Sequence, residues 1–206
     1  LTTVQDAGRF GHQAAGFSVS GPMDTDALYT ANILVNNPPD YACLEMVFQG
    51  AAVVFDRKTY FALTGADMSP TLNGAPIPMY RAIEVKAGDT LVCSVAKQGK
   101  YAYLAVAGGI DVPVVMGSRA TNLKCAIGGY QGRKLAFGDE LPLAVTGVFL
   151  DNHYRKHLEP PVFSNEITLR VVPGPQEDLF TDRGKQTFLS GTYTMQPDSD
   201  RMGIRL

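Results

Sequence analysis

Two glycine-rich segments with nearby arginines have the composition of an anion-binding site. Gly108–Gly109 precede Arg119, and Gly128–Gly129 precede Arg133. Backbone N–H groups of such loops and the forked guanidinium of arginine suit a carboxylate or a phosphate. Neither segment has the P-loop pattern or the GxGxxG pattern before a helix, so standard nucleotide binding has no support. Glycines at barrel corners and bulges explain the same composition equally well.

Two aspartates, Asp67 and Asp24, lie where a carboxylate could take part in chemistry or could simply form a turn or a helix cap. Asp67 comes directly after an apolar strand pattern, where a partly buried carboxylate could act as an acid or a base. Turn initiation explains Asp67 as well or better. Asp24 follows Gly21 and Pro22 at the start of a predicted helix. The N–H groups of a helix N-terminus attract anions, but Asp24 itself is expected to cap them.

The histidines, cysteines and serines predict no metal centre and no nucleophilic triad. His153 and His157 have i, i+4 spacing without the glutamate of a zincin, so they are interpreted as solvated residues. The three cysteines lie far apart with no CxxC pair, which favours a reduced, cytoplasmic setting over a disulfide framework. No serine lies in a GxSxG elbow. We therefore expect no metal ligands.

The composition limits the function classes. The 206 residues contain 18% charged residues, 21 glycines and 13 prolines, and the formal net charge is −2. Nucleic-acid binding needs clustered basic residues, so we expect no nucleic-acid partner. No apolar run reaches the length of about 20 residues that a membrane span needs, and the sequence opens on no signal peptide. A β-rich globular protein fits these values best.

Hydrophobic periodicity predicts one helix and a series of short strands that would hold these residues. The helix is expected over about residues 24–36, with Asp24 as its cap and Asn37 followed by two prolines at its end. Turn signals such as Asn73-Gly74 separate the strand patterns, as in an antiparallel sandwich or barrel. The expected strands are Leu44–Phe48, Ala52–Phe55, Tyr60–Thr64, Ile83–Val85, Thr90–Val95, Tyr101–Ala107, Val112–Val115 and Leu141–Val145.

A polar segment over residues 151–165 predicts a linker to a second domain. A short helix is expected over 175–183, and strands over 167–172, 187–189, 192–195 and 203–206. The chain opens on leucine and ends inside the last of these strand patterns. We therefore expect a fragment that holds one complete domain and the start of another.

Several long motifs, in this order along the chain, resemble one known family. They are TTVQDAGRFG, SGPMD, YLAVAGGIDVP, GGYQGR, GDEL, PGPQ and SDRMGIRL. The chain is similar throughout to the family called allophanate hydrolase subunit 2, KipA, or the biotin-dependent carboxyltransferase A/B region. The resemblance implies a mainly β protein with two cyclophilin-like β-barrel domains and few short helices. Residues 1–155 would form the first barrel, and residues 156–206 the linker and the start of an incomplete second barrel.

Stand-alone members of this kind resemble the C subunit of the prokaryotic 5-oxoprolinase. This implies ATP-dependent opening of 5-oxoproline to glutamate, with a KipI-like B subunit of the allophanate hydrolase subunit 1 family and a LamB/YcsF-like A subunit. The ring carbonyl would be phosphorylated and the activated species hydrolysed. The donors of Gly108–Gly109 and Gly128–Gly129, with Arg119 or Arg133, would suit a carboxylate or a phosphoryl group. Asp67 or Asp24 would be the base.

Two alternatives remain open at this point. The first is the carboxyltransferase component of a urea-carboxylase-like system, which moves CO2 from carboxybiotin to an amide nitrogen. The chain has no Met-Lys-Met biotin acceptor, so the biotin carrier would lie elsewhere. The second is a non-catalytic, KipA-like regulator that binds a KipI-like kinase inhibitor. All three functions imply a heteromeric partner.

Overall fold

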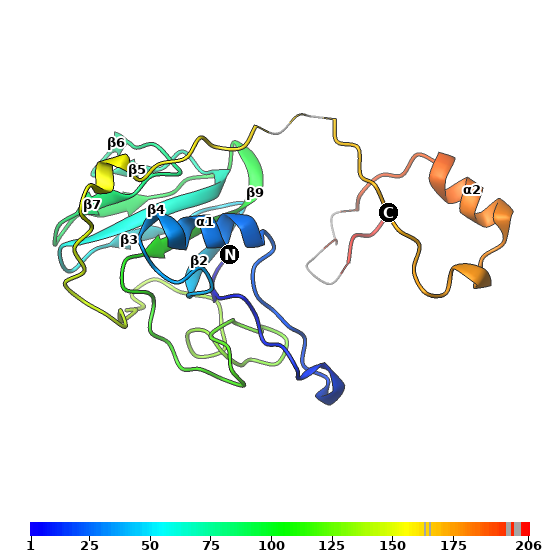
Figure 1. Cartoon of the computed structure of the whole chain (residues 1–206), viewed down its shortest axis with the longest axis horizontal. Helices are drawn as coiled ribbons and strands as arrows, with labels where there is room; N and C mark the ends of the chain where they lie inside the picture. Colours follow the sequence, from blue (N-terminus) through cyan, green and yellow to red (C-terminus); the bar gives the residue numbers. More distant parts are fainter. Residues whose placement is uncertain (163, 165, 197–198, 200–202) are drawn as a thin grey trace. The chain divides into compact units, whose positions relative to one another are not determined.

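A computed structural model describes residues 1–162, 164, 166–196, 199 and 203–206 (Figure 1). The chain divides into two units, residues 1–160 and 161–206, which are described separately. The division falls five residues after the predicted boundary at 155, because Leu158 N–H donates to Tyr80 O and Ala82 N–H donates to Lys156 O. Phe163 and Asn165 of the predicted linker lie outside the described residues, as do the motif residues 200–202.

The first unit contains two antiparallel sheets. The larger has the order β1-β2-β9-β4-β7, and the smaller has the order β3-β8-β5-β6. The larger sheet comprises β1 (Thr2–Gln5), β2 (Cys43–Val47), β9 (Gln98–Val106), β4 (Thr59–Asp67) and β7 (Ile83–Val85). The smaller comprises β3 (Ala52–Val54), β8 (Thr90–Val92), β5 (Thr71–Leu72) and β6 (Ala75–Pro76). The predicted mainly β class is confirmed.

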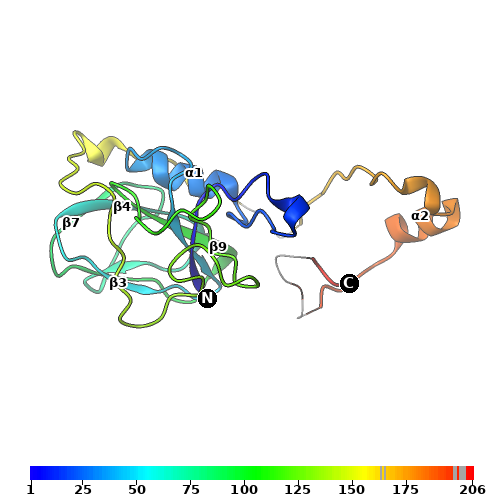
Figure 2. The same cartoon turned by 90° about the horizontal axis from the view of Figure 1, so that it is seen from below.

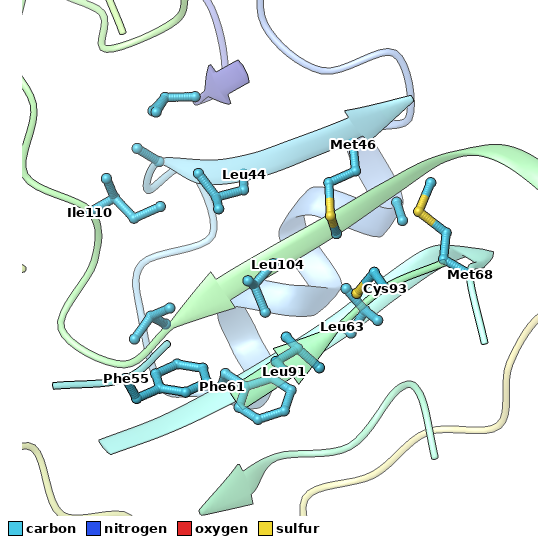
Figure 3. Packing of buried hydrophobic residues seen from close by; sticks show 14 of the residues in the cluster. Leu44, Met46, Phe55, Phe61, Leu63, Met68, Leu91, Cys93, Leu104 and Ile110 are labelled. Atoms are coloured by element: carbon cyan, nitrogen blue, oxygen red, sulfur yellow. The ribbon is translucent and has the colours of Figure 1, made fainter. Parts of the chain in front are cut away.

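The main core lies between the two sheets (Figure 3). Leu44, Leu63 and Leu104 are residues of β2, β4 and β9 that point to the same face of the larger sheet. Phe55 stacks on Phe61, with their ring centroids 5.4 Å apart. Because side chains alternate along a strand, the residues next to these positions face the opposite side of the sheet.

Helix α1 (Thr25–Leu34) covers that opposite face. Figure 2 shows α1 and β3 on opposite sides of the larger sheet. Ala27, Leu28 and Ala31 are buried against strand residues that include Tyr60 and Tyr103. The predicted helix is confirmed, with its cap at Asp24, whose Oδ1 accepts from the N–H of Ala27 at 2.9 Å.

Two expected strands are absent from the described part of the first unit, and three strands that were not expected, β1, β5 and β6, are present there. Residues 112–115 and 141–145 lie in a long loop after β9, where isolated bridges join Val115 to Ser118 and Ile110 to Leu143. Each segment contains a proline, which lacks the N–H that a ladder needs. β1 pairs with β2 from Thr2↔Met46 to Gln5↔Cys43, although no strand was predicted at residues 2–5.

The described residues of 161–206 form helices and irregular chain. They contain the 3-10 turn Glu177–Leu179 and helix α2 (Asp182–Ser190), so the expected strand over 187–189 is wrong. The expected strands at 167–172, 192–195 and 203–206 also are not formed within the described part. Ile167, Leu169 and Val171 have the alternation of a strand but no described partner strand. A ladder needs a neighbouring strand, so the alternation alone does not produce one. The second barrel stays a prediction.

Candidate functional site

The N-terminal segment, through the Asp6 carboxylate, forms hydrogen bonds with the loop that carries Arg119. Oδ1 of Asp6 accepts from Gly8 N–H at 2.9 Å and from the Ser118 hydroxyl at 2.6 Å, and Oδ2 accepts from Arg119 N–H at 2.5 Å. Asp6 and Arg9 lie three residues apart in the sequence, but no ion pair is found between them in the described part. The carboxylate instead takes two donors from a segment more than a hundred residues away and so fixes the backbone of Arg119.

Arg9 is fully buried, and its guanidinium donates to backbone carbonyl groups of the loop that carries Arg119. Its Nε donates to Val115 O and its Nη2 donates to Ala120 O, both at 2.9 Å. Gly128 lies directly against this guanidinium, since a Cβ added there would be 2.6 Å from Nη2. The arginine next to Gly128–Gly129 is therefore Arg9. Sequence spacing missed it because it precedes that loop by more than a hundred residues.

Arg119 and Arg133, the predicted anion ligands, are both engaged within the chain. Arg119 donates from Nε to Val112 O at 3.0 Å and from Nη2 to Asp111 at 3.1 Å. Arg133 makes a bidentate pair with Asp139 at 2.7 and 2.8 Å. The Arg133 hydrogen bond, followed by the Ala136 N–H, lowers the pKa of the Asp139 carboxyl to about 2. Both side chains are partly exposed, and both order the loop after β9.

The predicted glycine donors are also largely engaged. Gly108 N–H donates to Asn37 Oδ1 at 2.9 Å, and Gly109 N–H donates to Val106 O at 3.0 Å. Gly129 N–H donates to Arg119 O at 2.9 Å. These bonds favour the alternative interpretation of the segments, which is that their glycines form tight corners. Because these N–H groups already have acceptors within the chain, few of them can bind an anion.

Asp67 likewise shapes the chain. Its side chain is exposed, and Oδ1 accepts from Ser69 N–H at 2.8 Å, which is an Asx turn. The structure does not bring Asp67 into a polar cluster among the described residues. The turn interpretation therefore explains this residue.

Asp24 lies in a polar cluster at the first turn of α1. We call this cluster the α1 N-terminal site and define it as Asp24, Glu45, Gly65, Tyr80 and Tyr103. Glu45 is buried on β2, and its Oε2 accepts from the Tyr103 hydroxyl at 2.8 Å and from Met23 N–H at 3.0 Å. The same hydroxyl accepts from Asp24 N–H at 2.8 Å. Burial, with the Glu45 charge next, raises the pKa of Tyr103 and keeps its proton in place.

Tyr80 completes the α1 N-terminal site from the other side of β4. Its hydroxyl accepts from Gly65 N–H at 2.9 Å. Burial is the largest cause that raises the pKa of Tyr80; the Gly65 hydrogen bond lowers it, and the Asp24 charge raises it. Leu63 and Gly65 turn their backbone groups to the edge of β4 that lies away from β9, where Leu63 O accepts from Tyr80 N–H at 2.8 Å, so the Gly65 N–H faces the Tyr80 hydroxyl.

The α1 N-terminal site joins the Asp24 carboxylate, the buried Glu45 carboxylate, two phenol hydroxyls and the Gly65 N–H, which come from five segments of the chain. Such a set can donate to a carbonyl oxygen and accept from an N–H group. Sequence reasoning singled out only Asp24 by its chemistry. A signal for Glu45 was available, because a glutamate between Leu44 and Met46 in an apolar strand must find buried partners. Tyr80 carried no comparable signal.

Within the part of the chain that is described, no group of three or more histidine, cysteine, aspartate or glutamate side chains is arranged to hold a metal ion. The described helices include none that is long and apolar enough to cross a membrane. The α1 N-terminal site, as defined above, consists of hydroxyl, carboxylate and backbone groups.

Comparison with known proteins identifies the class of protein. Residues 15–206 match the family model of the carboxyltransferase domain, subdomain A and B, and the chain belongs to this family. It is 38% identical over 205 residues to the 5-oxoprolinase C subunit of Escherichia coli, covering all of this chain and 65% of that protein. It is 34% identical over 203 residues to the Haemophilus influenzae protein of the same name, covering 98% of this chain and 64% of the relative.

A solved structure shows the same fold. The urea carboxylase of Kluyveromyces lactis superposes with a TM-score of 0.86 at 34% identity, over 99% of this chain and 19% of that protein. The chain spans slightly less than two thirds of the two bacterial relatives. The predicted family is thus confirmed.

Proposed function

We propose that the protein is a component of an ATP-dependent 5-oxoprolinase, which opens the cyclic amide of 5-oxoproline to glutamate. The observation that carries this proposal is the 38% identity, along the whole chain, to a protein named as a subunit of that enzyme. In this proposal the chain acts in the cytoplasm with a KipI-like B subunit and a LamB/YcsF-like A subunit.

The chemistry of the α1 N-terminal site supports a cyclic amide as substrate. The amide offers a carbonyl oxygen that accepts a hydrogen bond and an N–H that donates one. The Tyr80 hydroxyl and the Asp24 carboxylate have the matching polarity. Asp24 is partly exposed and held at the helix start, so it is also the better placed of the two predicted bases.

The described residues do not fit the phosphates of ATP. Arg119 and Arg133 already bind Asp111 and Asp139, and the chain has no P-loop. We therefore assign ATP, which would supply the phosphoryl group that activates the ring carbonyl, to a partner protein. The residues of this chain would hold and orient the amide.

Reconstitution tests this function. The full-length protein, mixed with its A and B partners, should consume 5-oxoproline and ATP in equal amounts, and omission of any one component should abolish the reaction. Circular dichroism of each component verifies folding beforehand. Folded components that bind one another without consuming 5-oxoproline would contradict the proposal and favour the regulatory alternative.

A second candidate is the carboxyltransferase component of a urea-carboxylase-type system. The likeness to the Kluyveromyces lactis urea carboxylase structure favours it. It predicts biotin-dependent carboxyl transfer to urea or another amide when a carboxybiotinylated carrier is supplied. Absence of transfer with a carrier that is active toward an authentic carboxyltransferase would eliminate this candidate.

A further inference from the structure

The backbone of Tyr80 is held in an unusual conformation. Its φ of 55° lies in the left-handed region, which a bulky aromatic residue rarely adopts. Its N–H donates to Leu63 O at 2.8 Å, and its carbonyl accepts from Leu158 N–H at 2.9 Å. These bonds on both sides hold the strained residue, and they place its hydroxyl against Gly65. Strained residues of this kind concentrate at functional sites.

The proton of the Tyr80 hydroxyl remains unused within the described chain. Tyr60 and Tyr103, the other buried tyrosines, donate their protons to Glu84 at 2.9 Å and to Glu45 at 2.8 Å. Tyr80 is only 6% exposed, and its hydroxyl accepts from Gly65. No acceptor for its proton lies within hydrogen-bond distance in the described part. A phenol proton without an acceptor in the protein is available to a ligand.

Asp24 supplies an acceptor at the turn of α1 that packs over the residue next to Gly65. Its Oδ1 caps Ala27, while for Oδ2 the described residues provide no hydrogen-bond donor. The Thr64 hydroxyl donates to Ala27 O at 2.7 Å, which holds the first turn of α1 over the residue next to Gly65. The carboxylate thus lies at the same end of α1 as the Gly65–Tyr80 contact, and its charge contributes to the raised pKa of the Tyr80 hydroxyl.

We propose that Tyr80 and Asp24 form the amide-recognition pair of this protein: the Tyr80 hydroxyl donates to the substrate carbonyl oxygen, and Asp24 Oδ2 accepts from the adjacent N–H. The pair selects amides that present both groups along one edge, as a lactam or urea does and an ordinary trans peptide bond does not. This inference rests on the proposed function for the identity of the lactam, and it makes Tyr80 a substrate-contacting residue.

Four single variants of the full-length protein, assembled with its partners, test the pair. Y80F removes only the hydroxyl. D24N keeps the helix cap, because asparagine caps as well as aspartate, but it turns Oδ2 into a donor. Y60F is the matched control for a buried tyrosine, and D26N is the control for an aspartate in the same helical turn. The unfolding midpoint of each variant verifies that it folds.

Calorimetry measures binding of 5-oxoproline, its N-methyl derivative and urea, and kinetics give kcat and KM for 5-oxoproline. We expect Y80F to weaken lactam binding about fivefold and D24N about tenfold or more, with both controls within about twofold of the original protein. The N-methyl derivative lacks the N–H and should bind at least about tenfold more weakly. Lactam binding that is unchanged in Y80F and D24N, or reduced equally in all four variants, would overturn the inference.

The binding series separates this inference from the proposed function. If the original protein consumes no 5-oxoproline, the proposed function fails. Selective loss of lactam or urea binding in Y80F and D24N would still support the recognition pair. If the folded complex binds none of the three probes, the recognition pair is refuted, whatever reaction the complex performs.

Discussion

Replacement of Gly128 by alanine should strongly destabilise the first unit. Gly128 has a φ of 67°, and a Cβ there would lie 2.1 Å from Ala120 O and 2.6 Å from Nη2 of Arg9. The left-handed backbone alone costs alanine about 1–2 kcal/mol. Moving the Ala120 carbonyl away also breaks its charged hydrogen bond to Arg9, worth about 1.5–3 kcal/mol. The expected total is about 2.5–5 kcal/mol.

Urea denaturation followed by far-ultraviolet circular dichroism measures this loss. G74A is the matched control, because Gly74 has a φ of 82° but nothing within 4 Å of the added Cβ. It should cost only the backbone contribution of about 1–2 kcal/mol. In an R9M background the Ala120 bond is already absent, so G128A should cost about 1.5–3 kcal/mol less than in the original protein. Equal losses in G128A and G74A would refute the reasoning.

Three further predictions concern titration, hydrogen bonding and thiol chemistry. The pKa of the Asp139 carboxyl, measured by nuclear magnetic resonance, should be about 2. The contribution of this carboxylate to stability is present above about pH 4 and is lost as the pH falls from about 4 to 2. In R133M the pKa of Asp139 should return toward about 4. Y103F should lower the free energy of unfolding by about 1–3 kcal/mol, because Glu45 loses a donor in a buried site; a loss below about 0.5 kcal/mol would contradict that role. A thiol reagent should modify only Cys125 in the folded chain, since burial raises the pKa of the other two thiols, and a count of two or three fast-reacting thiols would be inconsistent with the structure.

The sequence predicted elements whose hydrogen bonds join nearby residues better than elements that need a distant partner. The period of Ala27, Leu28 and Ala31, with Asp24 before it, predicted α1 because helical hydrogen bonds join residues four apart. Strand patterns were less secure, because a strand also needs a partner. Val112–Val115 carries the apolar pattern without a ladder, and β1 forms because Thr2–Gln5 finds β2 about forty residues away.

By itself, the sequence determined the family, the mainly β class and the helix that positions Asp24. Tertiary structure decided the site. It paired Arg119 and Arg133 with acidic side chains, placed Asp67 in a turn, and set Arg9 against Gly128. It also brought Tyr80, Glu45 and Tyr103 to Asp24. Those contacts depend on strand register and on the first turn of α1, which link residues about 20 to 80 positions apart, and no local pattern encodes such distances.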